Sequence, residues 1–223
     1  MTISADTPVG RIAAEHPDAA RVFERHGIDY CCGGDSQLGE ACAQKGVDAG
    51  VALAEIQHVI DTVEAPEASW DEAPLADLID HIVATYHRSL DEELPRLMAL
   101  MEKVGSVHGE KNPEMFAELS RVYLGLKDEL EHHMMKEEGI LFPMIKNDQG
   151  AMGGGPISCM MHEHDSAGAA LTRIRALTDD YMVPEEACNS WTALWHGLEK
   201  LEGDLHTHIH LENNILFPRA LRG

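Results

Sequence analysis

The sequence predicts an all-α fold, in which a small N-terminal helical domain precedes an up-down four-helix bundle. Alternating β-branched runs, which would indicate strands, are absent, whereas apolar residues recur at steps of three and four along most of the chain. Four long amphipathic segments follow an acidic, proline-containing stretch, and short polar or glycine-rich connections separate them. Long helices joined by short connections pack as antiparallel neighbours in a bundle.

The domain boundaries follow from changes in composition. Several short helices are expected over residues 1–63, and Gly27 is a natural end for the helix predicted in HPDAARVFERHG. Residues 64–73 are expected to be a linker because the acidic stretch DTVEAPEASWDEAP is interrupted by prolines. Residues 74–223 are expected to form the four-helix bundle. Its four helices are predicted near residues 74–103, 113–146, 157–180 and 185–220.

Charge and cysteine content narrow the class of protein. The chain has 17 basic and 39 acidic residues and a net charge of −22, which repels nucleic acid and anionic membranes and suits a protein that handles cations. The first residues lack the basic and apolar regions of a signal peptide, and no run of about 18 apolar residues occurs. We therefore expect a cytoplasmic protein with no nucleic-acid or membrane partner. Five cysteines are too few and too unevenly spaced for a disulfide scaffold.

An internal repeat marks the expected site. The segments HMMKEEGILFP, residues 133–143, and HIHLENNILFP, residues 208–218, share the pattern H-x-x-x-E-x-x-I-L-F-P. A further histidine precedes each copy at a similar distance, His87 before the first and His164 before the second. Helical residues four apart lie on one face about one turn apart, so the His and Glu of each copy can reach the same point.

Helical periodicity places these polar residues on core-facing stripes. The stripe through the first copy continues to Ile140 and that through the second to Ile215, both expected in the core. The six residues predicted to point inward are His87, His133, Glu137, His164, His208 and Glu212. Burying six such groups costs several kcal/mol unless they are paired or bind a metal. A lone inward histidine is usually a hydrogen-bonded core residue, but the doubled pattern favours a metal site.

The ligand types indicate the metal. Two histidines and one carboxylate from each half form a set favoured by non-haem iron, and two facing sets make a dinuclear site in which Glu137 and Glu212 could bridge. Iron or manganese fits this set best. Of the remaining residues, His206 and His210 are expected to face solvent. Glu163 could orient a ligand or lie on a solvated acidic face.

The sequence resembles a known family, the iron-sulfur cluster repair di-iron proteins. The motifs that carry the resemblance are DYCCGG, DHIVATYH, HHMMKEEGILFPMI, GPIS, EHDSAG and HIHLENNILFPRAL, and they span nearly the whole chain. Members join a short domain with a Tyr-Cys-Cys-Gly-Gly signature to a hemerythrin-like bundle. The resemblance implies two iron ions in a dinuclear non-haem site, with an oxo bridge as an option. It also implies that the same six residues are ligands, with both glutamates bridging.

The resemblance further implies a stress-response role. The chain would repair iron-sulfur clusters damaged by nitric oxide or peroxide, and donation of iron is the expected means. Damaged iron-sulfur proteins, iron and nitric oxide are the expected partners. The main alternative is a non-haem di-iron enzyme that reduces nitric oxide, nitrite or peroxide, and a third is reversible dioxygen binding. The sequence leaves open whether the centre turns over a substrate and whether two chains form a homodimer.

The vicinal cysteines Cys31 and Cys32 are the candidate catalytic residues. Neighbouring Cα atoms about 3.8 Å apart disfavour a disulfide between them, whereas Cys42 could pair with either one. A helix is predicted to begin near Asp35, and its N-terminus would lower the pKa of both thiols. A soft-metal or redox module is the functional interpretation, and two cysteines that fill a tight turn are the alternative.

The two remaining cysteines match no signature. Cys159 and Cys188 are expected to be buried and to act as small hydrophobic side chains, because free cysteine is among the most buried residue types. A redox role is the alternative for each of them.

Overall fold

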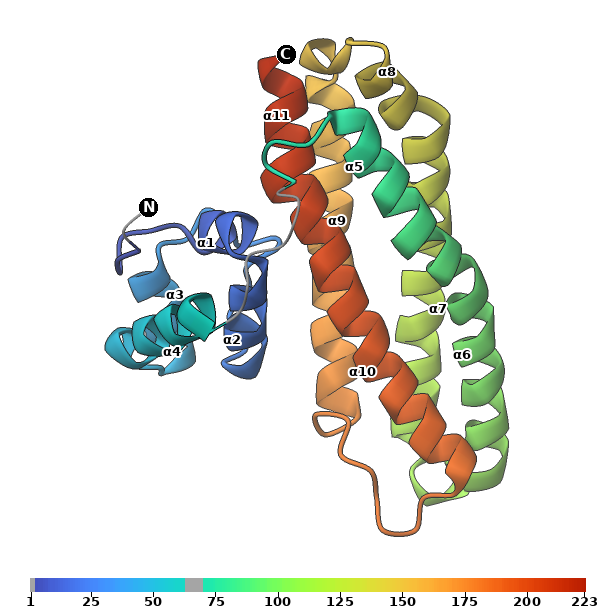
Figure 1. The fold of residues 1–223 in the computed structure, drawn as a ribbon. Helices are drawn as coiled ribbons and strands as arrows, with labels where there is room; N and C mark the ends of the chain where they lie inside the picture. Colours follow the sequence, from blue (N-terminus) through green and yellow to red (C-terminus); the bar gives the residue numbers. More distant parts are fainter. Residues whose placement is uncertain (1–2, 63–69) are drawn as a thin grey trace. The chain divides into compact units, whose positions relative to one another are not determined.

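The computed structural model describes residues 3–62 and 70–223, and within them the fold is helical (Figure 1). Extended pairing in this part of the chain is limited to one isolated bridge between Pro8 and Gln37. The prediction of an all-α fold is therefore confirmed. Residues 64–69 of the predicted linker lie outside the described residues, so the domain boundaries stay predictions.

The structure divides into two compact units. One contains residues 1–80, 145–154 and 206–223, and the other contains residues 81–144 and 155–205. Among the residues that the structure describes, no helix combines the length and apolarity needed to cross a membrane.

The N-terminal part of the first unit is a cluster of short helices. They are α1 (Val9–Glu15), η1 (Pro17–Ala19), α2 (Ala20–Arg25), α3 (Leu38–Lys45) and α4 (Ala49–Thr62). Gly27 and Gly46 have φ values of 63° and 69°, a left-handed conformation that ends α2 and α3. Fully buried Ile12, Phe23 and Leu38 belong to the apolar core that holds these helices together.

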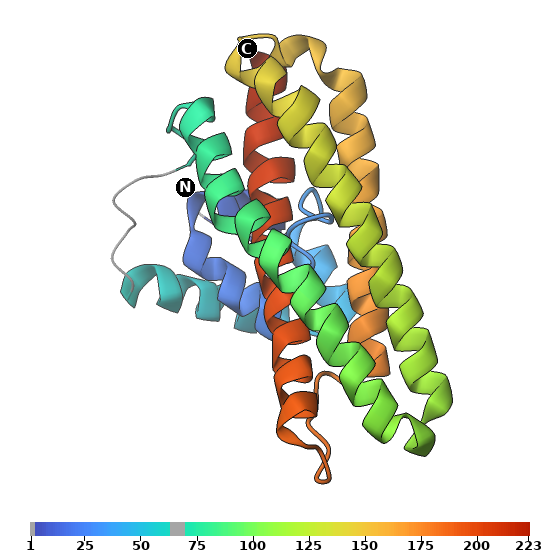
Figure 2. The same cartoon turned by 90° about the vertical axis from the view of Figure 1, so that its right-hand side faces the viewer.

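The second unit is a four-helix bundle. Its long helices run side by side in both views (Figures 1 and 2). They are α6 (Arg88–His108), α7 (Pro113–Lys136), α9 (Gly154–Leu177) and the part of α10 (Asn189–His210) up to Leu205. Helix α7 starts where its sequence indicates, since Asn112 accepts a hydrogen bond from the Met115 amide at 3.4 Å and Pro113 is the first helical residue.

Shorter helical segments extend the bundle helices. The segments α5 (Leu75–Ile82) and η2 (Val83–His87) precede α6, whereas η4 (Glu137–Leu141) and α8 (Phe142–Lys146) follow α7. The segments η6 (Leu211–Leu216) and α11 (Phe217–Arg222) follow α10. Short 3₁₀ turns η3 (Gly109–Lys111) and η5 (Gly150–Met152) lie in connections. These ranges agree with the four predicted helices to within a few residues at most ends.

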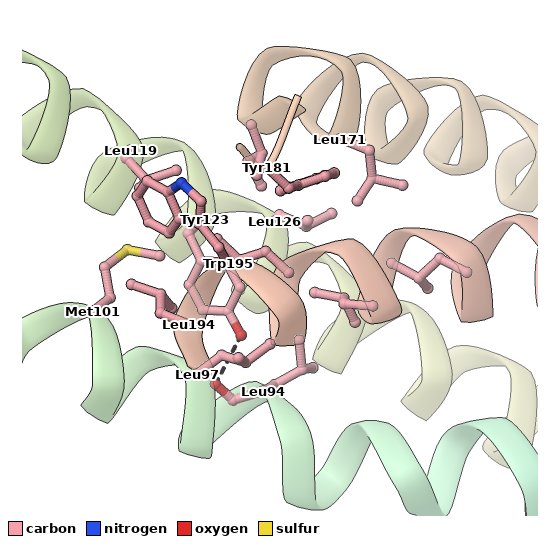
Figure 3. Close-up of a cluster of buried hydrophobic side chains, with 14 of the residues drawn as sticks. Leu94, Leu97, Met101, Leu119, Tyr123, Leu126, Leu171, Tyr181, Leu194 and Trp195 are labelled. Carbon is pink, nitrogen blue, oxygen red and sulfur yellow. Dashed lines mark hydrogen bonds between the residues drawn. The ribbon is translucent and has the colours of Figure 1, made fainter. Parts of the chain in front are cut away.

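The bundle core is apolar and closely packed (Figure 3). Leu97, Leu119 and Leu194 have no exposed surface, and Trp195 is 2% exposed. The buried Tyr123 hydroxyl donates a hydrogen bond of 2.9 Å to the Leu94 carbonyl and so ties α7 to α6. The stripes at steps of three and four that the sequence showed are the surfaces buried here.

Three π-helical segments interrupt the bundle helices, at η2, η4 and η6. A π turn closes i→i+5 hydrogen bonds and therefore moves the following side chains around the helix by one residue. The prediction that Ile140 lies in the core was wrong, because η4 turns Ile140 outward, 57% exposed, and buries Leu141 in its place. The prediction for Ile215 is confirmed, since it is 3% exposed.

Truncation of Leu194 tests the packing of the bundle core. We expect Leu194→Ala to lower the free energy of unfolding by about 2–5 kcal/mol, because the side chain is fully buried and a cavity would remain. The control Leu124→Ala, at a helical position that is 45% exposed, should change it by less than about 0.5 kcal/mol. Urea denaturation of the metal-free proteins measures both, and equal midpoints for the two variants would contradict the core assignment.

Candidate metal centre

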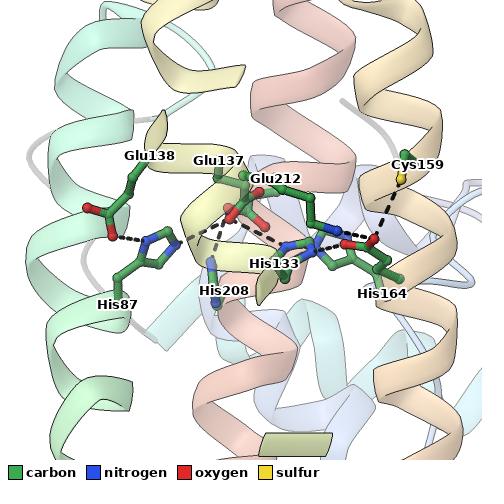
Figure 4. A network of polar contacts seen from close by, with 10 residues as sticks. His87, His133, Glu137, Glu138, Cys159, His164, His208 and Glu212 are labelled. Atoms are coloured by element: carbon green, nitrogen blue, oxygen red, sulfur yellow. Dashed lines mark hydrogen bonds and ion pairs between the residues drawn. The ribbon is translucent and has the colours of Figure 1, made fainter. Parts of the chain in front are cut away.

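All six sequence-predicted ligands are buried, each at most 3% exposed. Their candidate ligand atoms form two groups, and within each group all of these atoms lie within 4.8 Å of one another (Figure 4). One group contains His87, Glu137, His208 and Glu212. The other contains His133, Glu137, His164 and Glu212. The two groups share both glutamates, an arrangement that suggests a dinuclear metal site.

Glu137 has the surroundings expected of a bridging carboxylate. Its Oε2 atom lies 3.4 Å from His87 Nε2 and also 3.4 Å from His133 Nε2. The side chain has no exposed surface, and neither carboxylate oxygen accepts a hydrogen bond from any residue that the structure describes. A buried carboxylate in this condition is strongly destabilising unless a cation is close to it. Metal ions between Glu137 and the histidines on both sides would remove that cost.

The histidine pair in the second group has the spacing of two ligands on one ion. The Nε2 atoms of His133 and His164 are 3.0 Å apart. Two nitrogens bound at about 2.1 Å and at right angles to each other would also lie about 3.0 Å apart. In the other group, His208 Nε2 lies 3.0 Å from Glu212 Oε1, as the i to i+4 spacing of the repeat predicts. Each group thus presents its ligand atoms toward a common point.

Glu138 orients the first histidine. Its Oε1 atom lies 3.0 Å from His87 Nδ1 (Figure 4). The other oxygen of Glu138 pairs with Arg88. A carboxylate on Nδ1 fixes the proton there and leaves the Nε2 lone pair for a metal. Helical periodicity alone did not indicate Glu138. The available signal was its place next to Glu137 in the first copy of the repeat, where the second copy has Asn213.

Glu163 has the same role for His133. Its Oε2 atom lies 2.9 Å from His133 Nδ1, and its Oε1 pairs with Lys136. Partial burial acts to raise the pKa of Glu163, but the hydrogen bonds from Lys136 and His133 prevail and hold that pKa below its ordinary value. Glu163 is therefore an anion that orients a ligand, as one of the two sequence interpretations had it.

The prediction of burial was wrong for Cys159 and Cys188, which are both exposed. Cys159 lies one helical turn before Glu163 on the outer face of α9, and its thiol donates to Glu163 Oε1 at 3.5 Å. Cys188 precedes α10, and its Sγ lies 3.3 Å from His108 Nε2. Apolar stripes indicate which face of a helix is buried, but neither cysteine belongs to a stripe. The burial of both was therefore predicted from the residue type alone, and that prediction failed.

The vicinal cysteines lie in the loop between α2 and α3. One oxygen of Asp29, Oδ1, accepts hydrogen bonds from the amides of Cys31 and Cys32, each at 3.0 Å, and from the Cys31 thiol at 3.2 Å. The prediction of a lowered thiol pKa was wrong for Cys31, whose pKa is raised by its hydrogen bond to Cys32 and by burial. The reason is structural, because α3 begins only at Leu38 and a carboxylate, not a helix N-terminus, faces this thiol.

Two asparagines of the second repeat hold this loop. Asn214 donates to the carbonyls of Tyr30 at 3.2 Å and Cys31 at 3.1 Å, and Asn213 donates to the Cys31 carbonyl at 3.4 Å. The Asn214 amide lies so close to Gly10 and Gly34 that a β-carbon at either position would overlap it. The loop that carries the two cysteines is therefore joined to the helical segment that carries Glu212.

The prediction that His210 faces solvent was wrong, because Tyr30 of the cysteine loop packs against it. The His210 side chain is 5% exposed, its ring centroid lies 5.4 Å from that of Tyr30, and burial lowers its pKa to about 4. His206 is half-buried, and its ring centroid lies 6.4 Å from that of Tyr30. Helix geometry correctly turned both histidines away from His208, but it could not show that another segment covers that face.

Comparison with known proteins gives two family matches. A family described as hemerythrin HHE cation binding domain matches residues 78–220, which include all six candidate ligands, and a domain of unknown function (DUF542) matches residues 5–60. The iron-sulfur cluster repair protein YtfE of Escherichia coli O81 (strain ED1a) is 45% identical over 218 residues, 98% of each chain. The chain belongs to the YtfE iron-sulfur cluster repair protein family. YtfE proteins of Escherichia fergusonii and Shigella boydii serotype 4 are each 44% identical, again over 98% of both chains.

Replacement of both shared glutamates tests the metal centre. We expect Glu137→Leu with Glu212→Leu to stay helical but no longer to bind a pair of metal ions, because leucine fills the buried space without a ligand atom. Iron content after anaerobic loading, together with circular dichroism, measures this. The control pair Glu110→Leu with Glu114→Leu, at exposed positions, should keep normal iron content. Two irons in the first variant would contradict the assignment of the glutamates.

Replacement of Asn214 tests the attachment of the cysteine loop. Asn214→Leu removes the hydrogen bonds to the Tyr30 and Cys31 carbonyls, so we expect a loss of about 1–3 kcal/mol in the stability of the attached loop. Amide hydrogen exchange over residues 29–34 should accelerate by about 5- to 140-fold, since about 1.4 kcal/mol is a factor of ten. The exposed control Asn147→Leu should leave these amides unchanged. Unchanged exchange in Asn214→Leu would mean that other contacts hold the loop.

Proposed function

We propose that the chain is a di-iron protein that repairs iron-sulfur clusters damaged by nitrosative or oxidative stress, and that it does so by donating iron. One observation carries the proposal. Glu137 is a fully buried carboxylate with no hydrogen-bond donor among the described residues, and it lies 3.4 Å from histidines on both sides. The repair role is supported by relatives that are named iron-sulfur cluster repair proteins and match along nearly the whole chain.

The proposed ligand set assigns two histidines to each iron. His87 and His208 would hold one iron, His133 and His164 the other, and both glutamates would bridge. These residues account for four protein ligands on each ion. Histidine and carboxylate hold ferrous iron less tightly than thiolates do, which suits an ion that must be given up. When bound, the two irons would be the source of the iron that the damaged client lacks.

The residues outside the ligand set would control how tightly each iron is held. Glu138 and Glu163 keep the proton on Nδ1 of His87 and His133. The Nε2 atom of each ring therefore keeps its lone pair and faces the position of the metal. Arg88 pairs with Glu138, and Lys136 pairs with Glu163. These cations prevent the outer carboxylates from turning inward to compete for the metal. The chain would thus bind iron through a prearranged but replaceable set of nitrogen and oxygen ligands.

Cys31 and Cys32 are proposed as the reactive residues of the N-terminal domain. Thiolates bind iron more strongly than the histidine and carboxylate set, so they are suited to receive an ion that leaves the centre. The loop contact supports this role, because Asn213 and Asn214 link the Cys31 carbonyl to the segment that contains Glu212. The cysteines would act on iron in transit and not on the resting centre.

A second candidate function is reduction of nitric oxide, nitrite or peroxide. It is favoured by the ligand count, because four protein ligands leave two positions open on a six-coordinate ion. Small ligands such as nitric oxide could bind there. The two functions differ in what happens to the iron, which stays bound in an enzyme and leaves in a donor.

A single experiment separates these functions. The anaerobic, iron-loaded protein is added to a nitric-oxide-damaged iron-sulfur dehydratase, and both dehydratase activity and iron retained on the chain are followed. We expect recovery of activity with matching loss of iron, beyond the recovery caused by the same concentration of free ferrous iron. The variant Glu137→Leu with Glu212→Leu should give no recovery above that level. No recovery, with both irons retained and nitric oxide or peroxide consumed, would establish the enzyme instead.

A further inference from the structure

The α2–α3 loop contains a second cluster of metal-binding groups. One carboxylate oxygen of Asp29 and the sulfurs of Cys31 and Cys32 all lie within 4.8 Å of one another. None of these residues belongs to the two histidine-glutamate groups. Asp29 is exposed, Cys31 is 4% exposed and Cys32 is partly exposed, so the cluster lies where an ion could reach it from solvent.

The distance between the sulfurs fits a shared ion and not a disulfide. Cys31 Sγ and Cys32 Sγ are 3.8 Å apart, whereas a disulfide requires about 2.05 Å. Two thiolates bound at about 2.3 Å to one tetrahedral ion are about 3.8 Å apart. The third ligand is also near its required place, since Asp29 Oδ1 lies 3.2 Å from Cys31 Sγ and a tetrahedral site would need about 3.6 Å.

Contacts on both sides hold the loop in this shape. Asp29 accepts hydrogen bonds from the amides of Cys31 and Cys32, which fixes the carboxylate beside both thiols. A β-carbon at Gly33 would lie 3.0 Å from the Asp29 carbonyl oxygen and 3.3 Å from its carboxylate, so this close turn favours glycine. On the other side, Asn214 binds the Cys31 carbonyl. The three ligand atoms therefore come together before any ion binds.

We propose that Asp29, Cys31 and Cys32 form a mononuclear site for one thiophilic divalent cation. Three protein ligands leave the fourth tetrahedral position open, as in sites where an ion or a ligand must exchange. Binding releases the protons of both thiols, and the −3 charge of the ligands then exceeds the charge of the ion by one. The site would bind its ion transiently. It is not a structural zinc site, because a structural site would have a fourth protein ligand.

Ferrous iron is the natural ion for this site if the proposed function holds. The di-iron centre would supply it, and the open position would let a thiolate or sulfide of a damaged cluster take it over. This identity rests on the proposed function. The existence of the site does not, because it follows from the geometry of the loop alone.

Titration of the full-length protein with Co²⁺ under anaerobic, reducing conditions tests the site. Cobalt bound by histidine and glutamate gives no sulfur charge-transfer absorption, so a near-ultraviolet thiolate-to-cobalt band reports cobalt on cysteine, and the cysteine variants below show which thiols bind it. We expect this band to saturate at one equivalent of sulfur-bound cobalt. Cys31→Ser with Cys32→Ser should abolish it, and Asp29→Asn should weaken cobalt binding by at least about tenfold while the band remains. The control Cys42→Ser, in the same helical cluster, should titrate like the wild type.

Each outcome decides the proposal. A band that is absent from the wild type, or that persists when both cysteines are replaced, would overturn the site. Equal affinity in Asp29→Asn would remove Asp29 from it. Circular dichroism and the iron content of the di-iron centre should be normal in each variant, and Cys32→Ser alone, at a partly exposed position, provides a test should Cys31→Ser unfold. The repair assay is not involved, so its failure would leave this result intact.

Discussion

The structure depends on one constraint, which is that buried charge must be neutralised inside an apolar bundle. Glu137 has no exposed surface and no hydrogen-bond donor among the described residues, yet it occurs in a helix whose neighbours are leucine, methionine and tyrosine. Such a group is tolerated only where cations can surround it. The histidines on both sides, the outer carboxylates on their far nitrogens and the paired Arg88 and Lys136 all follow from that requirement.

The π-helical segments reconcile ligand placement with core packing. A regular helix would hold the apolar stripe in register through the site and bring Ile140 into the core. The extra residue in η4 lets Glu137 and Leu141 both face inward, and similar segments contain His87 and Glu212. Such segments are common at functional sites because they change side-chain register without ending the helix. The irregular backbone therefore coincides with the candidate ligands His87, Glu137 and Glu212.

The two copies of the repeat share their ligands but not their neighbours. Glu138 in the first copy orients His87, whereas the corresponding Asn213 in the second copy binds the carbonyl of Cys31. The first copy thus orients a candidate ligand, and the second copy is attached to the cysteine loop. Through Asn213 and Asn214, the second copy is therefore the one that contacts the loop with Cys31 and Cys32.

The sequence by itself determined the helical class, the four bundle helices and the six candidate ligands, because helical periodicity and a doubled motif are local patterns. It also showed the vicinal cysteines. Predictions from the sequence were wrong, however, for the pKa of Cys31, the exposure of Cys159 and the burial of His210. Each error concerns whether another segment packs against the side chain. Spacing along one helix cannot show this. Only the tertiary structure decided that Asp29 faces the thiols, that Asn214 holds their loop and that η4 turns Ile140 outward, because these depend on contacts between distant segments and on a change of helical hydrogen bonding.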